Sequence, residues 1–123
     1  MNYEITFCED YFLVVTSGAA AVAGFREMLS AVLEHEHWGR GKSLISDHSD
    51  LNASQLNVDD VRRIAQSSAE SRSKYGVRRH AVVAPRDLEY GLSRMWLAYI
   101  DDENPVISRV FRSREDAIAW TSS

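Results

Sequence analysis

The chain has 123 residues, 45% of them hydrophobic and 26% charged, which is the composition of one compact folded domain and excludes a disordered chain. Its formal net charge of −4 argues against nonspecific nucleic-acid binding, because that binding depends on neutralising phosphates. The single cysteine, Cys8, excludes a disulfide within the chain and is typical of a reducing cytoplasm. The longest apolar stretch, residues 11–25, is too short to span a membrane and follows acidic residues, so we expect a cytoplasmic protein without a membrane span.

The first part of the chain predicts two strands, a helix and a third strand. Apolar and polar residues alternate over residues 3–8, which is typical of a half-buried strand, and residues 11–16 form a second strand after a short turn. Apolar residues then recur at spacings of three and four, which predicts a helix over residues 19–37. Residues 43–47 are predicted as a short third strand that ends at Asp47.

The remainder of the chain alternates helices and strands. Asn57 is expected to cap one helix together with Asp60, and Ser113 is expected to cap the last helix together with Asp116. Gly91 lies inside a predicted helix, where it is unfavourable relative to alanine, so we expect a neighbouring group to pack closely against it. The predicted elements here are a helix at 58–75, a strand at 78–84, a helix at 86–100, a strand at 105–111 and a helix at 114–120.

This order of elements, β-β-α-β-α-β-α-β-α, predicts a single α/β domain with a mixed, mostly parallel five-stranded sheet. Polar residues such as Glu4, Ser46 and His80 interrupt the strands at alternate positions, so we expect one sheet face to be partly wet and most helices to pack on the other. Strands that follow one another in a single direction across the sheet would produce this arrangement. Such a sheet lacks the reversal of strand order where α/β proteins usually form a ligand crevice, which argues against a deep active site.

The common motifs of catalytic and cofactor sites are missing from the sequence. The glycines match neither the phosphate-binding loop nor the dinucleotide fingerprint, and no G-x-S-x-G nucleophile motif is found. His35 and His37 are two residues apart near the predicted end of a helix, so their side chains should point away from each other rather than to one metal ion. We therefore expect no cofactor, no metal site and no enzymatic activity.

Residues 81–96, AVVAPRDLEYGLSRMW, form a strand-to-helix corner that we interpret as structural. Pro85 suits the first turn of a helix, and Asp87 suits the positive end of the helix dipole. Arg86 is a candidate for binding an anion or a partner's carboxylate. Residues 58–96 hold eight Lys and Arg against five Asp and Glu, which we interpret as a solvated helix face, with a patch for an acidic partner as the alternative.

Several segments of the chain resemble the STAS/SpoIIAA-like family, in particular the small stand-alone STAS-like proteins of bacteria. They are the opening hairpin, the strand that ends at Asp47, the segment VVAPRDLEYGLSRMW with its Tyr90-Gly91 pair, and residues 109–120, RVFRSREDAIAW. The resemblance implies a SpoIIAA-like fold and a non-enzymatic domain that binds partner proteins, nucleotides or other small ligands. Some members are switched by phosphorylation of a serine in an Asp-Ser-Ser/Thr-Gly motif. Here Ser54 is the nearest serine, without the preceding Asp or the following Gly.

The hypothesis that follows is a regulatory or protein-interaction module, whose contact surface is the strand-to-helix edge and whose partner is another protein or a second copy of the chain. The residues assigned to this edge are Asp47, His48, Ser49, Ser54, Pro85, Arg86 and Asp87. Phosphorylation of Ser49 or Ser54 is left open. The alternative is a protein that binds a small molecule or an acyl lipid, with Met95 and Trp96 lining a cleft under the third helix.

Overall fold

The computed structural model describes residues 1–39, 41–100 and 107–123, and these contain five strands and four helices in the predicted order. In chain order the elements are β1 (Asn2–Phe7), β2 (Tyr11–Ala19), α1 (Val22–Leu33), β3 (Ser43–Asn52), α2 (Val58–Tyr75), β4 (Arg79–Val83), α3 (Asp87–Ile100), β5 (Ile107–Phe111) and α4 (Arg114–Thr121). The predicted α/β class with its five-stranded sheet is confirmed.

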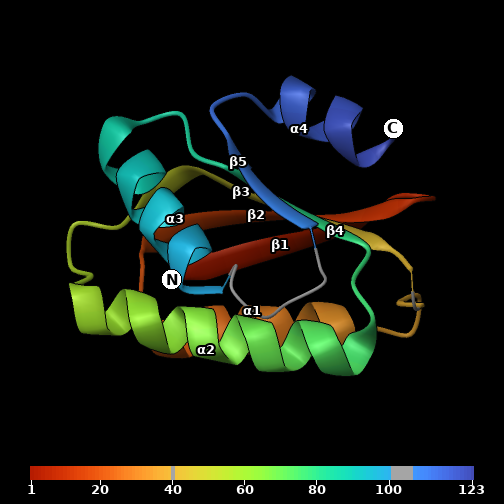
Figure 1. The fold of residues 1–123 in the computed structure, drawn as a ribbon, viewed down its shortest axis with the longest axis horizontal. Helices are drawn as coiled ribbons and strands as arrows, with labels where there is room; N and C mark the ends of the chain where they lie inside the picture. The colour runs from red at the N-terminus through yellow and green to blue at the C-terminus, as the bar shows by residue number, and fades with distance from the viewer. Residues whose placement is uncertain (40, 101–106) are drawn as a thin grey trace.

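The strands form one sheet in the order β1-β2-β3-β4-β5. β1 pairs with β2 in antiparallel fashion, and the three later pairs are parallel. The chain therefore crosses the sheet in one direction, and the strand order never reverses among the described elements. Figure 1 shows the consequence: α1, α2 and α3 cover one face of the sheet, and α4 lies on the opposite face. We call these the helix face and the outer face.

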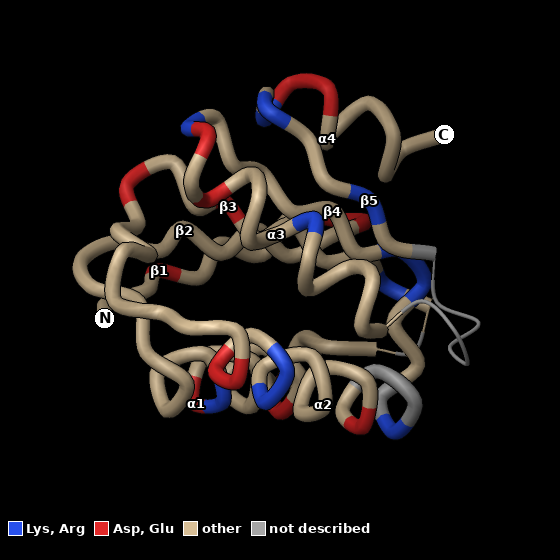
Figure 2. The backbone as a smooth tube through the Cα atoms, turned by 60° about the vertical axis from the view of Figure 1, so that its left-hand side comes forward, with Lys and Arg blue, Asp and Glu red and all other residues tan. Residues whose placement is uncertain are grey.

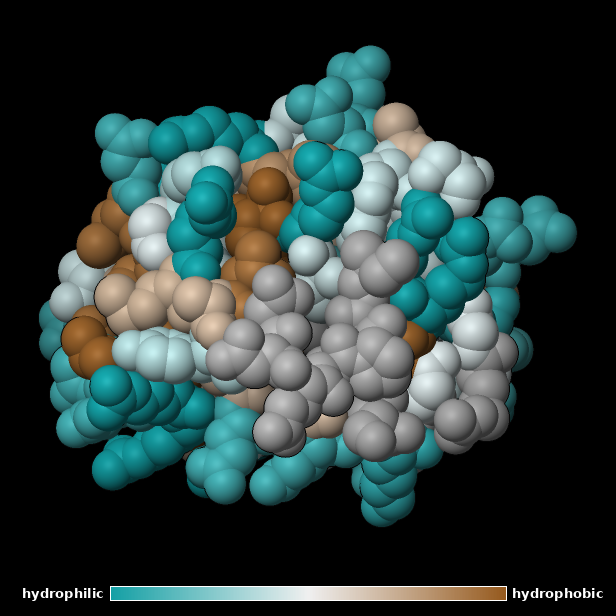
Figure 3. Space-filling model, in the orientation of Figure 1, coloured by the Kyte–Doolittle hydropathy of each residue, from teal (hydrophilic) through white to brown (hydrophobic). Residues whose placement is uncertain are grey.

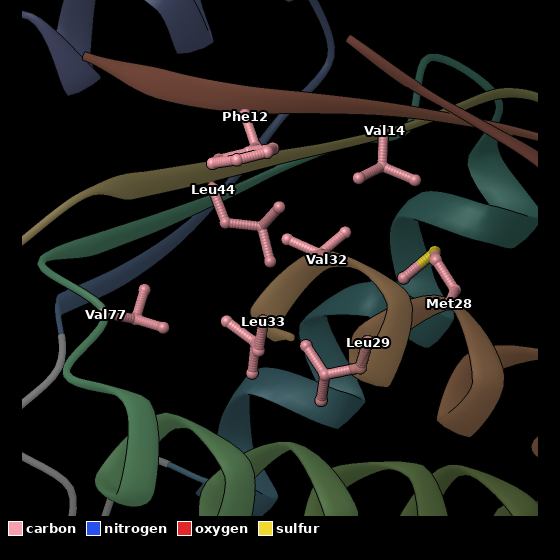
Figure 4. Packing of buried hydrophobic residues seen from close by; sticks show 8 residues of the cluster. All are labelled: Phe12, Val14, Met28, Leu29, Val32, Leu33, Leu44 and Val77. Carbon is pink, nitrogen blue, oxygen red and sulfur yellow. The ribbon is translucent and has the colours of Figure 1, made fainter. Parts of the chain in front are cut away.

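The helix face carries the main hydrophobic core. Phe12 and Val14 of β2, Leu44 of β3 and Val32 of α1 have 0% of their surface exposed. Figure 4 shows Val32 of α1 pointing toward these strands, while Leu29 of the same cluster lies on the side of α1 that faces α2. Burying a large apolar side chain of this kind contributes about 1.5–3 kcal/mol, so this cluster is a principal reason why α1 docks on the sheet.

The outer face has a smaller core beneath α4. Ile45, Ala81 and Val83 point to this side and are 0% exposed, and they pack with Ala117 of α4. Partly buried aromatic and aliphatic residues border this cluster, among them Trp120. One short helix thus shields the centre of this face, and contacts of α4 are made with β3, β4 and β5.

Two of the polar residues that interrupt the strands lie on the helix face and not on a wet face. Ser46 and His80 line the space under the helices and are buried, at 1% and 5% exposure. They are hydrogen-bonded to each other across β3 and β4, with 2.9 Å between Ser46 Oγ and His80 Nε2. A polar residue at an alternate position marks a solvated face only when it has no buried partner, and here it has one.

β3 is longer and α1 is shorter than the sequence predicts. β3 runs on to Asn52, because β2 continues alongside it to Ala19 with paired backbone groups. α1 ends at Leu33, so His35 and His37 lie in the turn that follows it. The argument that these histidines diverge on a helix was therefore wrong, since their ring centroids are 5.4 Å apart.

Both predicted helix caps are confirmed. Asn57 and Asp60 exchange hydrogen bonds between side chain and backbone at the start of α2, and Ser113 accepts a hydrogen bond from the backbone of Asp116 at the start of α4.

The expectation that a neighbouring group packs closely against Gly91 is wrong, because a Cβ atom at this position would have no heavy atom within 4 Å. Gly91 lies on the exposed side of α3, where nothing in the structure requires a glycine.

The basic character of the middle of the chain belongs largely to exposed side chains. Figure 2 shows charged residues of both signs along α2. Arg62 and Arg63 each lie three residues after an aspartate, at 3.8 Å from Asp59 and 3.9 Å from Asp60. Such exposed pairs contribute only a few tenths of a kcal/mol, and they balance the charge of the helix surface. None of the described helices has both the length and the apolar character needed to cross a membrane.

Candidate functional site

A pocket lies between the helix face of the sheet and helices α1, α2 and α3. Its cavity volume is about 70 Å³. A single water needs roughly 10–15 Å³, so the pocket has room for a small molecule. Its wall consists of Phe25, Met28, Leu29, Ser46, His48, Leu51, Ala53, Leu56, Val61, Ile64, Ser68, His80, Val82, Glu89, Leu92, Ser93 and Trp96.

The wall is mostly apolar, with polar side chains from four different elements, β3, α2, β4 and α3. On the β4 side, the His80 ring meets the Trp96 ring edge-to-face, with 5.3 Å between their centroids. Ser68 of α2 donates a hydrogen bond to the carbonyl of Ile64, at 2.9 Å, as expected of a serine inside a helix. These bonds satisfy polar groups that would otherwise be buried without partners.

His48 is placed by an irregularity in the pairing of β2 with β3. The register shifts between Val15 and Ser17, so that one residue of β2, Thr16, lies opposite two residues of β3. At this bulge the Thr16 hydroxyl lies 2.6 Å from His48 Nδ1 and 3.2 Å from the carbonyl oxygen of Asp47. Bulges commonly redirect a side chain in this way, and here the imidazole forms part of the pocket wall.

Burial makes His48 a poor base. Its side chain is 6% exposed, and desolvation lowers its pKa from 6.5 to about 4, although the charges of Asp47 and Glu89 act in the opposite direction. The imidazole is therefore neutral at pH 7. It is available for hydrogen bonding within the pocket but carries no charge there.

Glu89 of α3 joins the helix to the end of β3 at the border of the pocket. One carboxylate oxygen accepts a hydrogen bond from the backbone nitrogen of Ala53 at 3.0 Å, and the other lies 3.2 Å from Arg86 Nε. Arg86 also donates to the carbonyl oxygen of Leu51. The side chain of Glu89 is almost fully buried, so this ion pair supplies the counter-charge that a buried carboxylate needs.

Asp47 points to the outer face, away from the pocket. It is 1% exposed and accepts hydrogen bonds from the backbone and hydroxyl of Ser49, and from Arg114 Nε at 2.7 Å. Burial alone would raise the pKa of Asp47, but the hydrogen bonds from Ser49 and the charge and hydrogen bond of Arg114 together lower it. Asp47 and Ser49 thus help to hold the start of α4 against β3.

The remaining residues of the predicted contact edge lie where β3 and β4 end. Ser54, Pro85 and Asp87 are exposed, and Asp87 forms an ion pair with Arg112 at 2.8 Å. The structure therefore separates the seven assigned residues into three groups. His48 lines the pocket, Asp47 and Ser49 hold α4, and the others lie at the rim, where Arg86 is engaged with Leu51 and Glu89 as described.

Sequence reasoning found only part of the pocket. His48 and Trp96 were named, but Met95 lies outside the wall, and the buried Ser46, His80 and Glu89 were missed. The available signal was the alternation Ser46-x-His48 in a strand that is otherwise apolar at its start. Among the described residues, no three His, Cys, Asp or Glu side chains are grouped closely enough to hold a metal ion.

No family model matches the sequence, and no curated protein matches it either. Among solved structures, the chain is similar to an uncharacterised protein of the DUF3478 family with a SpoIIAA-like fold from Shewanella loihica PV-4, with a TM-score of 0.57 and 16% sequence identity. The match covers 98% of this chain and 92% of that chain. At this level of identity the similarity shows the fold, and the SpoIIAA-like fold that the sequence resemblance implied is confirmed.

Proposed function

We propose that this chain is a non-enzymatic binding protein of the STAS-like type, and that it binds a small, mainly apolar molecule in the pocket between the sheet and α1–α3. The observation that carries the proposal is the pocket itself, whose apolar wall contains a few convergent polar side chains. An apolar wall with a few convergent polar groups is the usual composition of a small-molecule site. This composition favours the binding of a small molecule, the alternative considered from the sequence, over a protein-interaction module.

The state of the polar groups favours binding over catalysis. His48 has a pKa of about 4, which makes it a weak proton acceptor at neutral pH. Glu89 is held by Ala53 and Arg86, and such an arrangement anchors α3 rather than moving protons. The pocket wall therefore offers shape, apolar surface and hydrogen bonds, which are the requirements of recognition.

A second candidate function, the binding of a protein partner, is favoured by the rim. Ser54, Pro85 and Asp87 are exposed there, and the neighbouring Leu88 has 49% of its surface exposed. Figure 3 shows apolar surface around α3 between hydrophilic side chains, which is the kind of surface that protein partners cover. Arg86 is less suited to a partner than the sequence indicates, because it is already paired with Glu89.

Binding of toluene, followed through the backbone amide resonances of the protein, tests the pocket. We expect the shifts to concentrate on wall residues of β3, α2 and α3. Ser93→Phe should abolish them, because Ser93 lines the pocket and a benzyl group there would fill it, whereas Ala98→Phe on the exposed side of the same helix should bind as the wild type does. Native mass spectrometry of the same samples separates a ligand adduct from a dimer. Equal shifts in both variants, or none in the wild type, would contradict the proposal.

A further inference from the structure

The hydrogen bonds around Thr16 determine which ring nitrogen of His48 carries the proton. The Thr16 hydroxyl has one proton and lies within hydrogen-bond distance of two groups, the carbonyl oxygen of Asp47 at 3.2 Å and Nδ1 of His48 at 2.6 Å. A carbonyl oxygen only accepts, so the contact with Asp47 is a hydrogen bond only when the hydroxyl donates its one proton there. The contact with His48 is then a hydrogen bond only if Nδ1 is protonated and donates to the hydroxyl oxygen.

A neutral imidazole with a protonated Nδ1 has a bare lone pair on Nε2. No residue in the described part of the chain forms a hydrogen bond with Nε2 of His48. The ring is 6% exposed and forms part of the pocket wall, so this lone pair is a buried acceptor without a protein donor. Buried polar groups in this state are normally satisfied by an ordered water or by a bound molecule that replaces it.

Glu89, another ionisable group in the wall, is an acceptor as well. One oxygen of the Glu89 carboxylate accepts a hydrogen bond from Ala53 and the other forms an ion pair with Arg86, and a carboxylate has lone pairs for about four hydrogen bonds. Its charge is matched by Arg86, so the pocket has no unpaired negative charge from this residue to attract a cation. A cationic ligand would also lose its hydration in a wall formed mainly by aliphatic and aromatic side chains.

We infer that the ligand is a neutral, mostly apolar molecule that carries a hydroxyl or N–H group, and that this group donates a hydrogen bond to Nε2 of His48. The inference rests on the proposed function, because it names the ligand class of the same pocket. It also assigns a role to Thr16, which touches no ligand but positions His48 by accepting a hydrogen bond from its Nδ1–H group. An alkane, an ether or an ester of the same size would leave the acceptor unsatisfied.

Phenol and toluene are suitable probes, since they share a ring and differ only in a hydroxyl in place of a methyl group. Affinities at pH 7 should be measured for the wild type, His48→Phe and the control Ser93→Ala, which changes another polar residue of the wall. His48→Phe should weaken phenol binding about fivefold and leave toluene binding unchanged, because one hydrogen bond is lost. Ser93→Ala should leave the ratio of the phenol affinity to the toluene affinity as it is in the wild type. Because both probes are measured in every variant, the difference in their hydrophobicity cancels from the comparison.

A second measurement does not depend on the stability of a variant. The ¹⁵N resonances of His48 in the wild type should show a protonated Nδ1 and an unprotonated Nε2, and Thr16→Val should release this preference and weaken phenol binding. A protonated Nε2, or phenol binding unaffected by His48→Phe, would overturn the inference while toluene binding still supports the pocket. If neither probe binds the wild type, the inference and the proposed function fail together.

Discussion

At the scale of single residues, the neighbours of a side chain decide its role more than its chemical type does. The chain contains four histidines, and two of them, His48 and His80, are buried in the pocket wall. Asp47 and His48 are consecutive, yet they face opposite sides of the sheet, where one is an ionised partner of Arg114 and the other a neutral hydrogen-bonding group. The alternation of strand side chains therefore places Asp47 against α4 and its neighbour His48 in the pocket wall.

The low pKa of His48 predicts a loss of stability in mild acid. An imidazole has an ordinary pKa of 6.5, and burial lowers that of His48 to about 4 in the folded protein. As the pH falls below 6.5, the unfolded chain binds a proton that the folded chain excludes, so the free energy of unfolding decreases until both states are protonated near pH 4. Above pH 6.5 this residue makes no contribution to the pH dependence.

Urea unfolding of the wild type and of His48→Phe at pH 7 and pH 4.5 measures this effect. The wild type should lose roughly 2–3 kcal/mol more than the variant between the two values, since one pKa unit corresponds to about 1.4 kcal/mol. All other titrating groups are shared by the two proteins, so the difference isolates His48. An equal decrease of the free energy of unfolding in the two proteins would show that the imidazole is protonated inside the fold.

At the scale of elements, the sequence predicts the limits of a helix best where the helix has both a periodic apolar pattern and a capping residue. The limits of α2, 58–75, match the prediction, because Asn57 and Asp60 define its start and Gly76 follows its end with a positive φ of 67°. β3 was predicted too short, because Asp47 and the polar residues after it are typical of a loop. Their backbone groups pair with β2 and their side chains find buried partners, and both are tertiary effects.

The pocket was missed for the same reason. The predicted strand order is confirmed among the described elements, and it argues against a crevice at the sheet edge. The cavity forms between layers, where the side chains of Phe25 of α1 and of Leu92 and Trp96 of α3 leave space above β3 and β4. No local pattern encodes this space, because it depends on how far each helix stands from the sheet.

The contact between α3 and the end of β3 is predicted to depend on Arg86. Removing its guanidinium in Arg86→Ala leaves the buried carboxylate of Glu89 without its cation and the carbonyl of Leu51 without a donor. We expect thermal and urea unfolding to show a loss of about 2 kcal/mol, the usual magnitude for hydrogen bonds to a charged group. Because Arg86 is half exposed, solvent replaces part of the interaction, so the effect should not reach that of a fully buried pair.

The double variant Arg86→Ala, Glu89→Gln provides the matched control for this prediction. An amide at position 89 still accepts a hydrogen bond from the backbone of Ala53 but needs no counter-charge, so part of the lost stability should return. If the double variant is as unstable as the sum of the two single variants, the two side chains act independently and the ion pair does not hold α3.

At the scale of the whole molecule, crossing the sheet in one direction places α1, α2 and α3 on the same face and leaves the outer face to α4 (Figure 1). The molecule therefore consists of a thick layer that contains the pocket and a thin layer of one short helix. α4 has eight residues, too few to be stable as an isolated helix, so its order depends on contacts with the sheet. The bond between Arg114 and the buried Asp47 is the ionic part of those contacts.

This division predicts that α4 opens without the rest of the molecule. In Arg114→Ala the carboxylate of Asp47 keeps its two hydrogen bonds from Ser49 but loses its cation, which should weaken the docking of α4 by roughly 1.5–3 kcal/mol. Amide hydrogen exchange in α4 should then be at least tenfold faster, while exchange in α2 stays unchanged, because local opening of α4 leaves the helix face intact. Glu115→Gln, an exposed change in the same turn, should leave both rates near those of the wild type. Equal acceleration in α2 and α4 would mean that the two layers unfold as one unit, and a ligand in the pocket would then stabilise α4 as strongly as it stabilises α3.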